Sequence, residues 1–211
     1  MKIAVIAANG RTGKEFVKYA LSQGHTIRAG IHRHNTLSSH PNLLILPCDV
    51  NDIAHIERLI AGCDAVVSLI GHVNGSQADI QTRGIHNIIA VMKKHRMRRI
   101  LSLTGSGVRF KFDRITPMDR ILNLSISILD PQRVKDGNNH AEVLKSTDLD
   151  WTILRVLKLQ NTRPNLFQLT ENGPTKTFVS RKEVAHALLQ ILELGTFNHR
   201  APMISYISRR P

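Results

Sequence analysis

The stretch from Ile3 to Gly13 holds the residue types and spacing best suited to binding a ligand. A short apolar run ends in a small, turn-prone segment, and an amphipathic helix pattern follows directly. The turn residues are Ala8, Asn9, Gly10, Arg11, Thr12 and Gly13. A buried strand, a tight turn and a helix N-terminus with exposed amides form a site for the diphosphate of a dinucleotide.

The glycines of this turn have different predicted roles. Gly13 falls where the helix must pack closely on the strand, and Gly10 falls where the backbone must approach a phosphate. The first glycine of the usual G-x-x-G-x-x-G spacing is replaced by Ala7. The alternative is a junction that uses glycine for geometry alone. Because strand, turn and helix come in the required order, the pattern favours cofactor binding.

The segment after the second predicted strand indicates which dinucleotide is preferred. Sites for NAD carry Asp or Glu there to accept a hydrogen bond from the ribose 2′-hydroxyl. Residues 29–35 contain no acid, and Arg33 offers a planar guanidinium suited to a phosphate. Arg11 could approach the same phosphate from the other side. The sequence therefore predicts NADP rather than NAD, with a plain surface role for Arg33 as the alternative.

Polar residues at the ends of later strands are the candidates for catalysis. Thr104 and Ser106 could hydrogen-bond a nicotinamide amide or a substrate oxygen, or they could only satisfy the surrounding glycine turn. Ser68 offers the same two alternatives. His72 and His140 are conceivable proton donors because histidine titrates near neutral pH. A surface position is the simpler interpretation of both histidines.

Apolar runs alternate with helical patterns along nearly the whole chain, as in βαβ units around a parallel sheet. Strands are expected at 2–7, 25–31, 43–47, 65–70, 99–104, 151–156 and 203–207. Helices are expected at 12–23, 52–61, 77–96, 114–129 and 134–146, and at 181–194 after a capping box that opens at Ser180. Residues 158–176 are expected to form loops with a small hairpin, and Lys158 there could neutralise an acidic substrate or simply lie at the surface.

This pattern predicts a single-domain α/β Rossmann fold over residues 1–211, with a parallel, doubly wound sheet and helices on both faces. A loop-rich segment around 107–180 is expected on the substrate side. The 211 residues suffice for one domain with a substantial core.

The net charge of +13 attracts polyanions in general. The only marked basic cluster, residues 93–99, falls at the end of a predicted helix, where cations favour the helix dipole. An aromatic content of 4% offers few platforms for stacked bases, which argues against nucleic acid as a partner.

The remaining composition points to an intracellular protein. No apolar run is long enough to cross a bilayer, the N-terminus lacks a signal-peptide layout, and we expect a cytoplasmic location. Cys48 and Cys63 lack metal-type spacing and are expected to be inert thiols.

Several segments resemble the atypical short-chain dehydrogenases, in particular the NmrA-like and biliverdin/flavin reductase-like branch of NAD(P)-binding proteins. Residues 3–13 are similar to the family's I-x-V-x-G-A-x-G-x-x-G start, and residues 149–155 resemble its G-L-D-W-T-I-x-R strand. Residues 181–188 match its R-x-D/E-V-A helix. The proline that the family carries after the strand arginine is Val156 here.

The resemblance also implies further cofactor contacts. Asp49 and Val50 match the segment in which an acid contacts adenine and its neighbour packs beside it. The loop after the fourth strand, which borders the nicotinamide ribose in the family, corresponds to Ser68, Leu69, Ile70 and Gly71. Thr104 lies in the segment that the family places beside the reacting ring.

One departure limits the chemistry. Ordinary short-chain dehydrogenases use a Tyr-x-x-x-Lys pair to move a proton, but neither Tyr19 nor Tyr206 has a lysine four positions on. Reductases of the biliverdin/flavin type can dispense with that pair. The sequence therefore predicts an NADPH-dependent reductase with a flavin-, quinone- or tetrapyrrole-like acceptor. The alternatives are a non-catalytic NADP(H) sensor that binds a partner protein and a polyanion-binding protein on a degenerate nucleotide fold.

Overall fold

The structure, a computed structural model, describes residues 1–207 and centres on an eight-stranded sheet. The order across the sheet is β3-β2-β1-β4-β5-β6-β10-β8. The strands are β1 (Lys2–Ile6), β2 (Thr26–Ile31), β3 (Leu43–Pro47), β4 (Ala65–Ser68), β5 (Arg99–Gly105), β6 (Asp150–Val156), β8 (Gln168–Thr170) and β10 (Met203–Ser205). All pair in parallel except β8, which runs antiparallel to β10. The order reverses direction at β1, as in a Rossmann fold.

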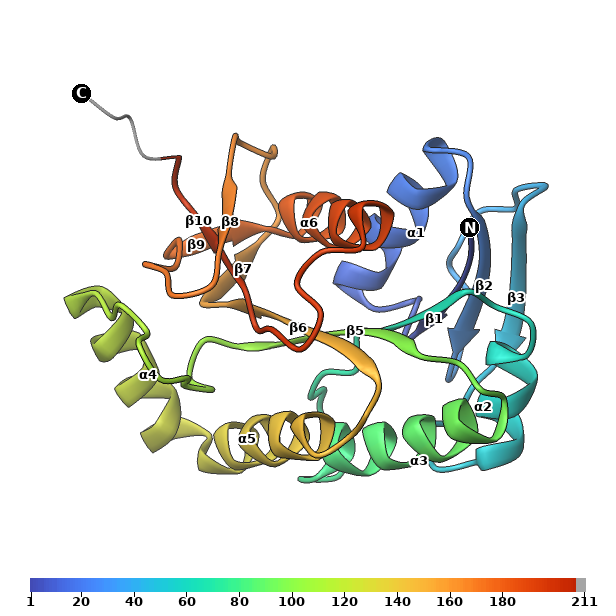
Figure 1. The fold of residues 1–211 in the computed structure, drawn as a ribbon, viewed down its shortest axis with the longest axis horizontal. Helices are drawn as coiled ribbons and strands as arrows, with labels where there is room; N and C mark the ends of the chain where they lie inside the picture. Colours follow the sequence, from blue (N-terminus) through green and yellow to red (C-terminus); the bar gives the residue numbers. More distant parts are fainter. Residues whose placement is uncertain (208–211) are drawn as a thin grey trace.

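Helices cover both faces of the sheet, as predicted (Figure 1). The helices are α1 (Arg11–Ser22), α2 (Ile53–Ile60), α3 (Ile80–Lys94), α4 (Pro117–Leu129), α5 (Pro131–Lys145) and α6 (Arg181–Leu194). α1 and α6 lie on one face, and α2, α3 and α5 lie on the other. α4 lies beyond the sheet and ends where α5 begins.

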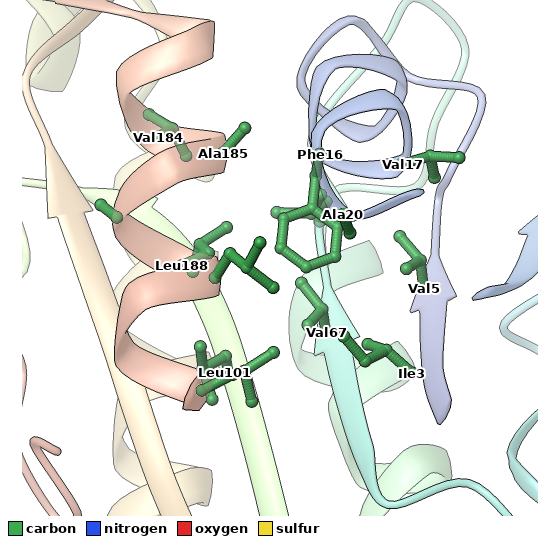
Figure 2. Packing of buried hydrophobic residues seen from close by; sticks show 14 of the residues in the cluster. Ile3, Val5, Phe16, Val17, Ala20, Val67, Leu101, Val184, Ala185 and Leu188 are labelled. Carbon is green, nitrogen blue, oxygen red and sulfur yellow. The ribbon is translucent and has the colours of Figure 1, made fainter. Parts of the chain in front are cut away.

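Each face has its own buried apolar cluster, because successive strand residues point to opposite sides of the sheet. Figure 2 shows the first cluster, in which Phe16 of α1 lies between Leu188 of α6 and Val67 of β4. Phe16 is fully buried. This packing holds the N-terminal end of α1 against the centre of the sheet, where the predicted binding turn begins.

The predicted hairpin in residues 158–176 is wrong. β7 (Lys158–Gln160) instead pairs in parallel with β9 (Phe178–Ser180), which precedes α6. β8 pairs with β10 and forms the last strand of the main sheet, with Leu169 opposite Ile204. Strands of three residues carry too little periodicity to reveal their partners, so the pairing follows from tertiary contacts.

Several helix ends differ from the predicted bounds for local reasons. α5 begins at Pro131 rather than at residue 134, because the Asp130 side chain accepts a hydrogen bond from the Arg133 amide and proline suits the first helical turn. Similarly, Thr116 caps α4, so this helix begins at 117 rather than 114. α3 ends at 94 because Arg96 adopts a positive φ of 53°. The capping box between Ser180 and Glu183 is confirmed.

A buried ion pair ties β6 to the chain that follows β5. The side chain of Arg155 is fully buried and forms two hydrogen bonds with the Asp113 carboxylate, at 2.5 and 2.9 Å. Its guanidinium also donates to the backbone oxygens of Val108 and Ala201. Arg155 therefore holds the start of the segment that was expected to be loop-rich.

Within the described residues, no helix combines the length and apolar character needed to cross a membrane.

Candidate nucleotide-binding site

The turn after β1 is tight and depends on one glycine. Ala7 adopts a left-handed conformation with φ of 58°, and its carbonyl oxygen accepts a hydrogen bond from the Gly10 amide at 3.0 Å. A Cβ atom on Gly13 would lie 2.4 Å from the oxygen of Ala7 and 2.6 Å from that of Ala8. Gly13 therefore permits the close contact of α1 with β1, as its position in the sequence predicts.

The N-terminus of α1 presents backbone N–H donors that no capping side chain accepts. Gly10 is the N-cap and provides no side chain to accept from the first-turn amides, and the first turn contains no acid. The first amides of a helix have no partner within the helix, and this end of a helix carries a partial positive charge. The backbone from Arg11 to Gly13 consequently fits a diphosphate.

Asn9 joins this turn to the segment after β2. Its side-chain amide donates to the His34 carbonyl, and its side-chain oxygen accepts from the Thr36 amide at 3.3 Å and from the Thr36 hydroxyl. Arg33 precedes this contact and is exposed, as is Arg11. The structure therefore brings the two predicted phosphate-binding regions side by side. The spacing of the glycines gave no signal for this role of the Asn9 side chain.

The segment after β3 lies beside the same loop. The carboxylate of Asp49 is 3.7 Å from Nε2 of His32, and it accepts hydrogen bonds from both the backbone and the side chain of Asn51. The carbonyl of Val50 accepts from the Asn87 side chain at 2.8 Å. Asp49 and Val50 thus lie where an adenosine moiety would be expected, at the carboxyl ends of β2 and β3.

The end of β4 is buried and held from α3. Ser68, Leu69 and Ile70 are buried, whereas Gly71, three residues after β4, is exposed. The Gln81 side chain donates to the Ile70 carbonyl at 2.7 Å. This contact gives the loop one defined path beside the exposed Gly71.

Thr104 and Ser106 lie in different surroundings. The hydroxyl of Ser106 donates to the Asp119 carboxylate at 3.2 Å, within a buried cluster completed by Arg109 and Asn123. Thr104 instead faces α5, where a Cβ atom added to Gly137 would lie 3.1 Å from its hydroxyl oxygen. The structure does not bring the two hydroxyls to a common point.

A buried carboxylate that the sequence analysis missed organises the surroundings of Thr104. Asp136 of α5 accepts hydrogen bonds from the amides of Gln81 and Thr82, each at 2.9 Å, and so caps α3 from a different helix. The same carboxylate binds Nε2 of His72 at 2.9 Å. The side chain of His72 is only 10% exposed, so the interpretation of His72 as a surface histidine is wrong.

His140 is also buried rather than exposed. Burial lowers its pKa from 6.5 to about 4, and the nearby charge of Asp136 opposes this shift without cancelling it. The imidazole is therefore neutral at pH 7, and its Nδ1 atom has no hydrogen-bond partner among the described residues. In contrast, Lys158 is exposed, with its ammonium 5.6 Å from the ring centre of Phe178.

The basic cluster of residues 93–99 forms ion pairs at the end of α3. Lys94 and His95 both contact Glu57, at 2.6 and 2.9 Å, and Arg98 contacts Asp150 at 3.2 Å. The hydrogen bonds from Lys94 and His95 lower the pKa of Glu57. These pairs favour the interpretation of the cluster as a solvated helix end.

The two thiols have surroundings that keep them protonated. Cys48 and Cys63 are buried and free, and burial raises the pKa of both, for Cys48 to about 12.

Comparison with known proteins agrees with this geometry. A family model described as NAD(P)H-binding matches residues 7–194, and the chain therefore belongs to this NAD(P)H-binding family. The match begins at the turn after β1 and ends with α6. The resemblance to the atypical short-chain dehydrogenases is confirmed.

Individual relatives point the same way. YwnB of Bacillus subtilis, an uncharacterised protein, is 27% identical over 206 residues, which cover 92% of each chain. A short-chain dehydrogenase/reductase from Veillonella parvula, solved with NADP, has a TM-score of 0.81 at 15% identity and covers 98% of this chain and 94% of its own. SP1627 from Streptococcus pneumoniae, a proposed NADH-flavin reductase, has a TM-score of 0.77 at 21% identity and covers 97% and 98%. At these identities the two structures establish the fold.

Proposed function

We propose that this protein is an NADPH-dependent reductase of the atypical short-chain type, acting on a flavin-, quinone- or tetrapyrrole-like acceptor. The observation that carries the proposal is the uncapped N-terminus of α1, which Asn9 holds beside the Arg33 segment. Main-chain amides there suit a diphosphate, and the exposed guanidinium group of Arg33 suits the additional phosphate of NADPH. When bound, the reduced nicotinamide supplies the hydride.

The residues of this chain would orient the acceptor and provide a proton. Thr104 lies near the carboxyl end of β5, and ligands of open α/β sheets bind at the carboxyl ends of the strands. We assign its hydroxyl to a hydrogen bond with a carboxamide or an acceptor oxygen. His72 follows the exposed Gly71, and the Asp136 carboxylate fixes its ring. We assign His72 as the proton donor and Ser106 to support of the turn, since its hydroxyl is already engaged with Asp119.

The test begins with binding. NADPH and NADH are titrated by fluorescence against the native protein and the Arg33→Gln variant. We expect NADPH to bind more tightly than NADH. Arg33→Gln should weaken the binding of NADPH by about tenfold or more and have little effect on the binding of NADH, because only NADPH presents the extra phosphate. Arg120→Gln, an exposed charge-matched change on α4, is the control. Failure of both coenzymes to bind at millimolar concentration would refute the proposal.

Turnover is tested next. Oxidation of NADPH is followed with a panel of flavins, quinones and biliverdin-type compounds. His72→Gln should lower kcat and leave the affinity for NADPH unchanged, because the ring is assigned to proton transfer rather than to coenzyme binding. Reduction of no member of the panel would rule out the reductase.

A second function, a non-catalytic NADP(H) sensor that binds a partner protein, is favoured by one observation. α4 presents an exposed apolar surface that includes Ile121, Leu124 and Ile128, and Asp119 is its only buried residue. Tight NADPH binding without turnover, together with a protein captured from cells in only one redox state of the coenzyme, would support the sensor over the reductase.

A further inference from the structure

A strongly basic cavity lies between the N-terminal ends of α1 and α6. Its volume is about 510 Å³, which is in the range of small-molecule sites. Five cations line it together with a single acid, Glu15. The cations are Arg11, Lys14, Arg163, Arg181 and Lys182. Among the described residues, no carboxylate oxygen lies within 4.0 Å of any of these five charges.

Arg181 is the central feature of this cavity. It is 7% exposed, and its Nη1 atom donates to the side chain of Asn161 at 2.7 Å, but its buried Nε atom has no partner in residues 1–207. Burial, followed by the positive charge of Arg11, lowers the pKa of Arg181, and Glu15 only partly opposes this. A buried guanidinium without a carboxylate partner is costly unless something else supplies negative charge.

The wall of the cavity is already held in place. The Ser180 hydroxyl donates to the Thr162 carbonyl at 2.7 Å, and the Asn165 amide donates to Glu183 at 2.8 Å. Glu183 is itself paired with the buried Lys176 at 2.8 Å, so its charge is not available to the cavity. The segment that carries Arg163 is therefore held against α6 by hydrogen bonds within the chain.

The cavity is not lined by the Arg33 segment, to which we assign the coenzyme's extra phosphate. The Arg33 segment follows β2, on one side of β1. Asn161 and Arg181 directly follow β7 and β9, which form a separate two-stranded sheet. Both strands come after β6 in the chain, and β6 lies on the other side of β1 in the main sheet. In a Rossmann fold the nicotinamide half of the dinucleotide lies on this second side. The cavity thus adjoins the region where an acceptor would meet the nicotinamide.

We propose that this cavity binds the phosphate group of a phosphorylated acceptor, with Arg181 as its main ligand and Arg163 as a second one. The guanidinium fork of arginine suits an oxyanion, and the volume leaves room for part of the molecule attached to the phosphate. The proposal deepens the proposed reductase function by naming a chemical class for its acceptor.

Binding of flavin mononucleotide and riboflavin, which differ by one phosphate, tests the site. Both are titrated by flavin fluorescence against protein saturated with NADP⁺, which prevents turnover. We expect flavin mononucleotide to bind at least about tenfold more tightly, and we expect inorganic phosphate to displace it. Arg181→Gln should abolish the difference between the two flavins. Arg163→Gln, in an exposed segment where folding is not at risk, should reduce it. Arg120→Gln should leave it intact.

The outcomes separate this proposal from the proposed function. Equal binding of the two flavins, or a phosphate preference that survives Arg181→Gln and Arg163→Gln, overturns the site. Loss of NADP⁺ affinity in Arg181→Gln without any flavin preference shows that the cavity serves the coenzyme and also overturns it. A preference for the phosphorylated flavin without NADPH turnover supports the site and rejects the reductase. NADPH turnover without that preference supports the reductase and rejects the site.

Discussion

Replacing Gly13 by alanine tests the link between the turn after β1 and the stability of the fold. The added Cβ atom would lie 2.4 Å from the oxygen of Ala7 and 2.6 Å from the oxygen of Ala8. Carbon atoms in ordinary contact are about 3.5–4.0 Å from their neighbours, so the overlap is about 1 Å. Both oxygens belong to the backbone that follows β1, and β1 is held between β2 and β4. The helix must therefore move.

The cost of that movement follows from the packing of α1. A shift of α1 away from β1 also loosens Phe16, which is fully buried in the first apolar cluster. Overpacking of this kind costs about 1–3 kcal/mol, and we place this case at the upper end because the contact atoms are backbone. Alanine recovers up to about 1 kcal/mol through its better helix propensity. We expect a net loss of about 2 kcal/mol in the free energy of unfolding.

The assay is urea unfolding followed by the fluorescence of Trp151, the only tryptophan of the chain, which is buried in β6. Gly10→Ala is the matched control. Its Cβ atom would lie 3.1 Å from one oxygen and φ is −66°, so the stability should fall by less than about 1 kcal/mol. For NADPH affinity the order of the two variants should be reversed. Gly10→Ala should weaken NADPH binding more than Gly13→Ala does, since only the Gly10 change places a methyl group directly at the phosphate. Equal stabilities of Gly13→Ala and Gly10→Ala would refute the reasoning.

Three further variants test other parts of the structure. Ala7→Gly relieves a left-handed alanine and should raise the free energy of unfolding by about 0.5–1 kcal/mol, measured by urea unfolding; no gain would contradict the positive φ. Arg155→Met leaves the buried Asp113 charge unpaired and should cost about 3–5 kcal/mol, with partial recovery in the double variant with Asp113→Asn; an unchanged melting temperature would argue against the pair. His140 has a lowered pKa in the fold, so the unfolded chain binds more protons and stability falls as the pH drops from about 6.5 to about 4, by about 3 kcal/mol in all. His140→Gln should flatten this part of the pH profile of urea unfolding, and an unchanged slope would contradict the assignment.

Local patterns in the sequence predict the order of the elements and the turn after β1 well. Alternation of apolar runs with helical periodicity requires a covered parallel sheet, and the contact between Gly13 and the end of β1 follows from glycine spacing alone. The positive φ of Ala7 was not predicted, because alanine seldom adopts it. The predicted hairpin was wrong for a related reason: residues 161–177, which separate β7 from β9, carry no periodic signal that shows which strands pair.

The supports of the candidate site were harder to predict, because they join segments that are distant in the sequence. Asp136 caps α3 from another helix, and Asn9 reaches the segment after β2. Each contact joins residues more than twenty positions apart, beyond the range of turn and capping patterns.

A signal for Asp136 was nevertheless present in α5. Asp136, His140 and Leu144 are spaced four residues apart and therefore share one face of the predicted helix. Leu144 must point to the core, so the two polar residues on the same face must be buried with it. Because buried polar groups require partners, a carboxylate and an imidazole on the apolar stripe of a helix beside the carboxyl ends of β4 and β5 indicate a buried polar cluster at that position. The same reasoning applies to Arg181, which shares the inward face of α6 with Ala185 and Leu188. Its buried Nε atom, which has no partner within residues 1–207, distinguishes it from a surface arginine.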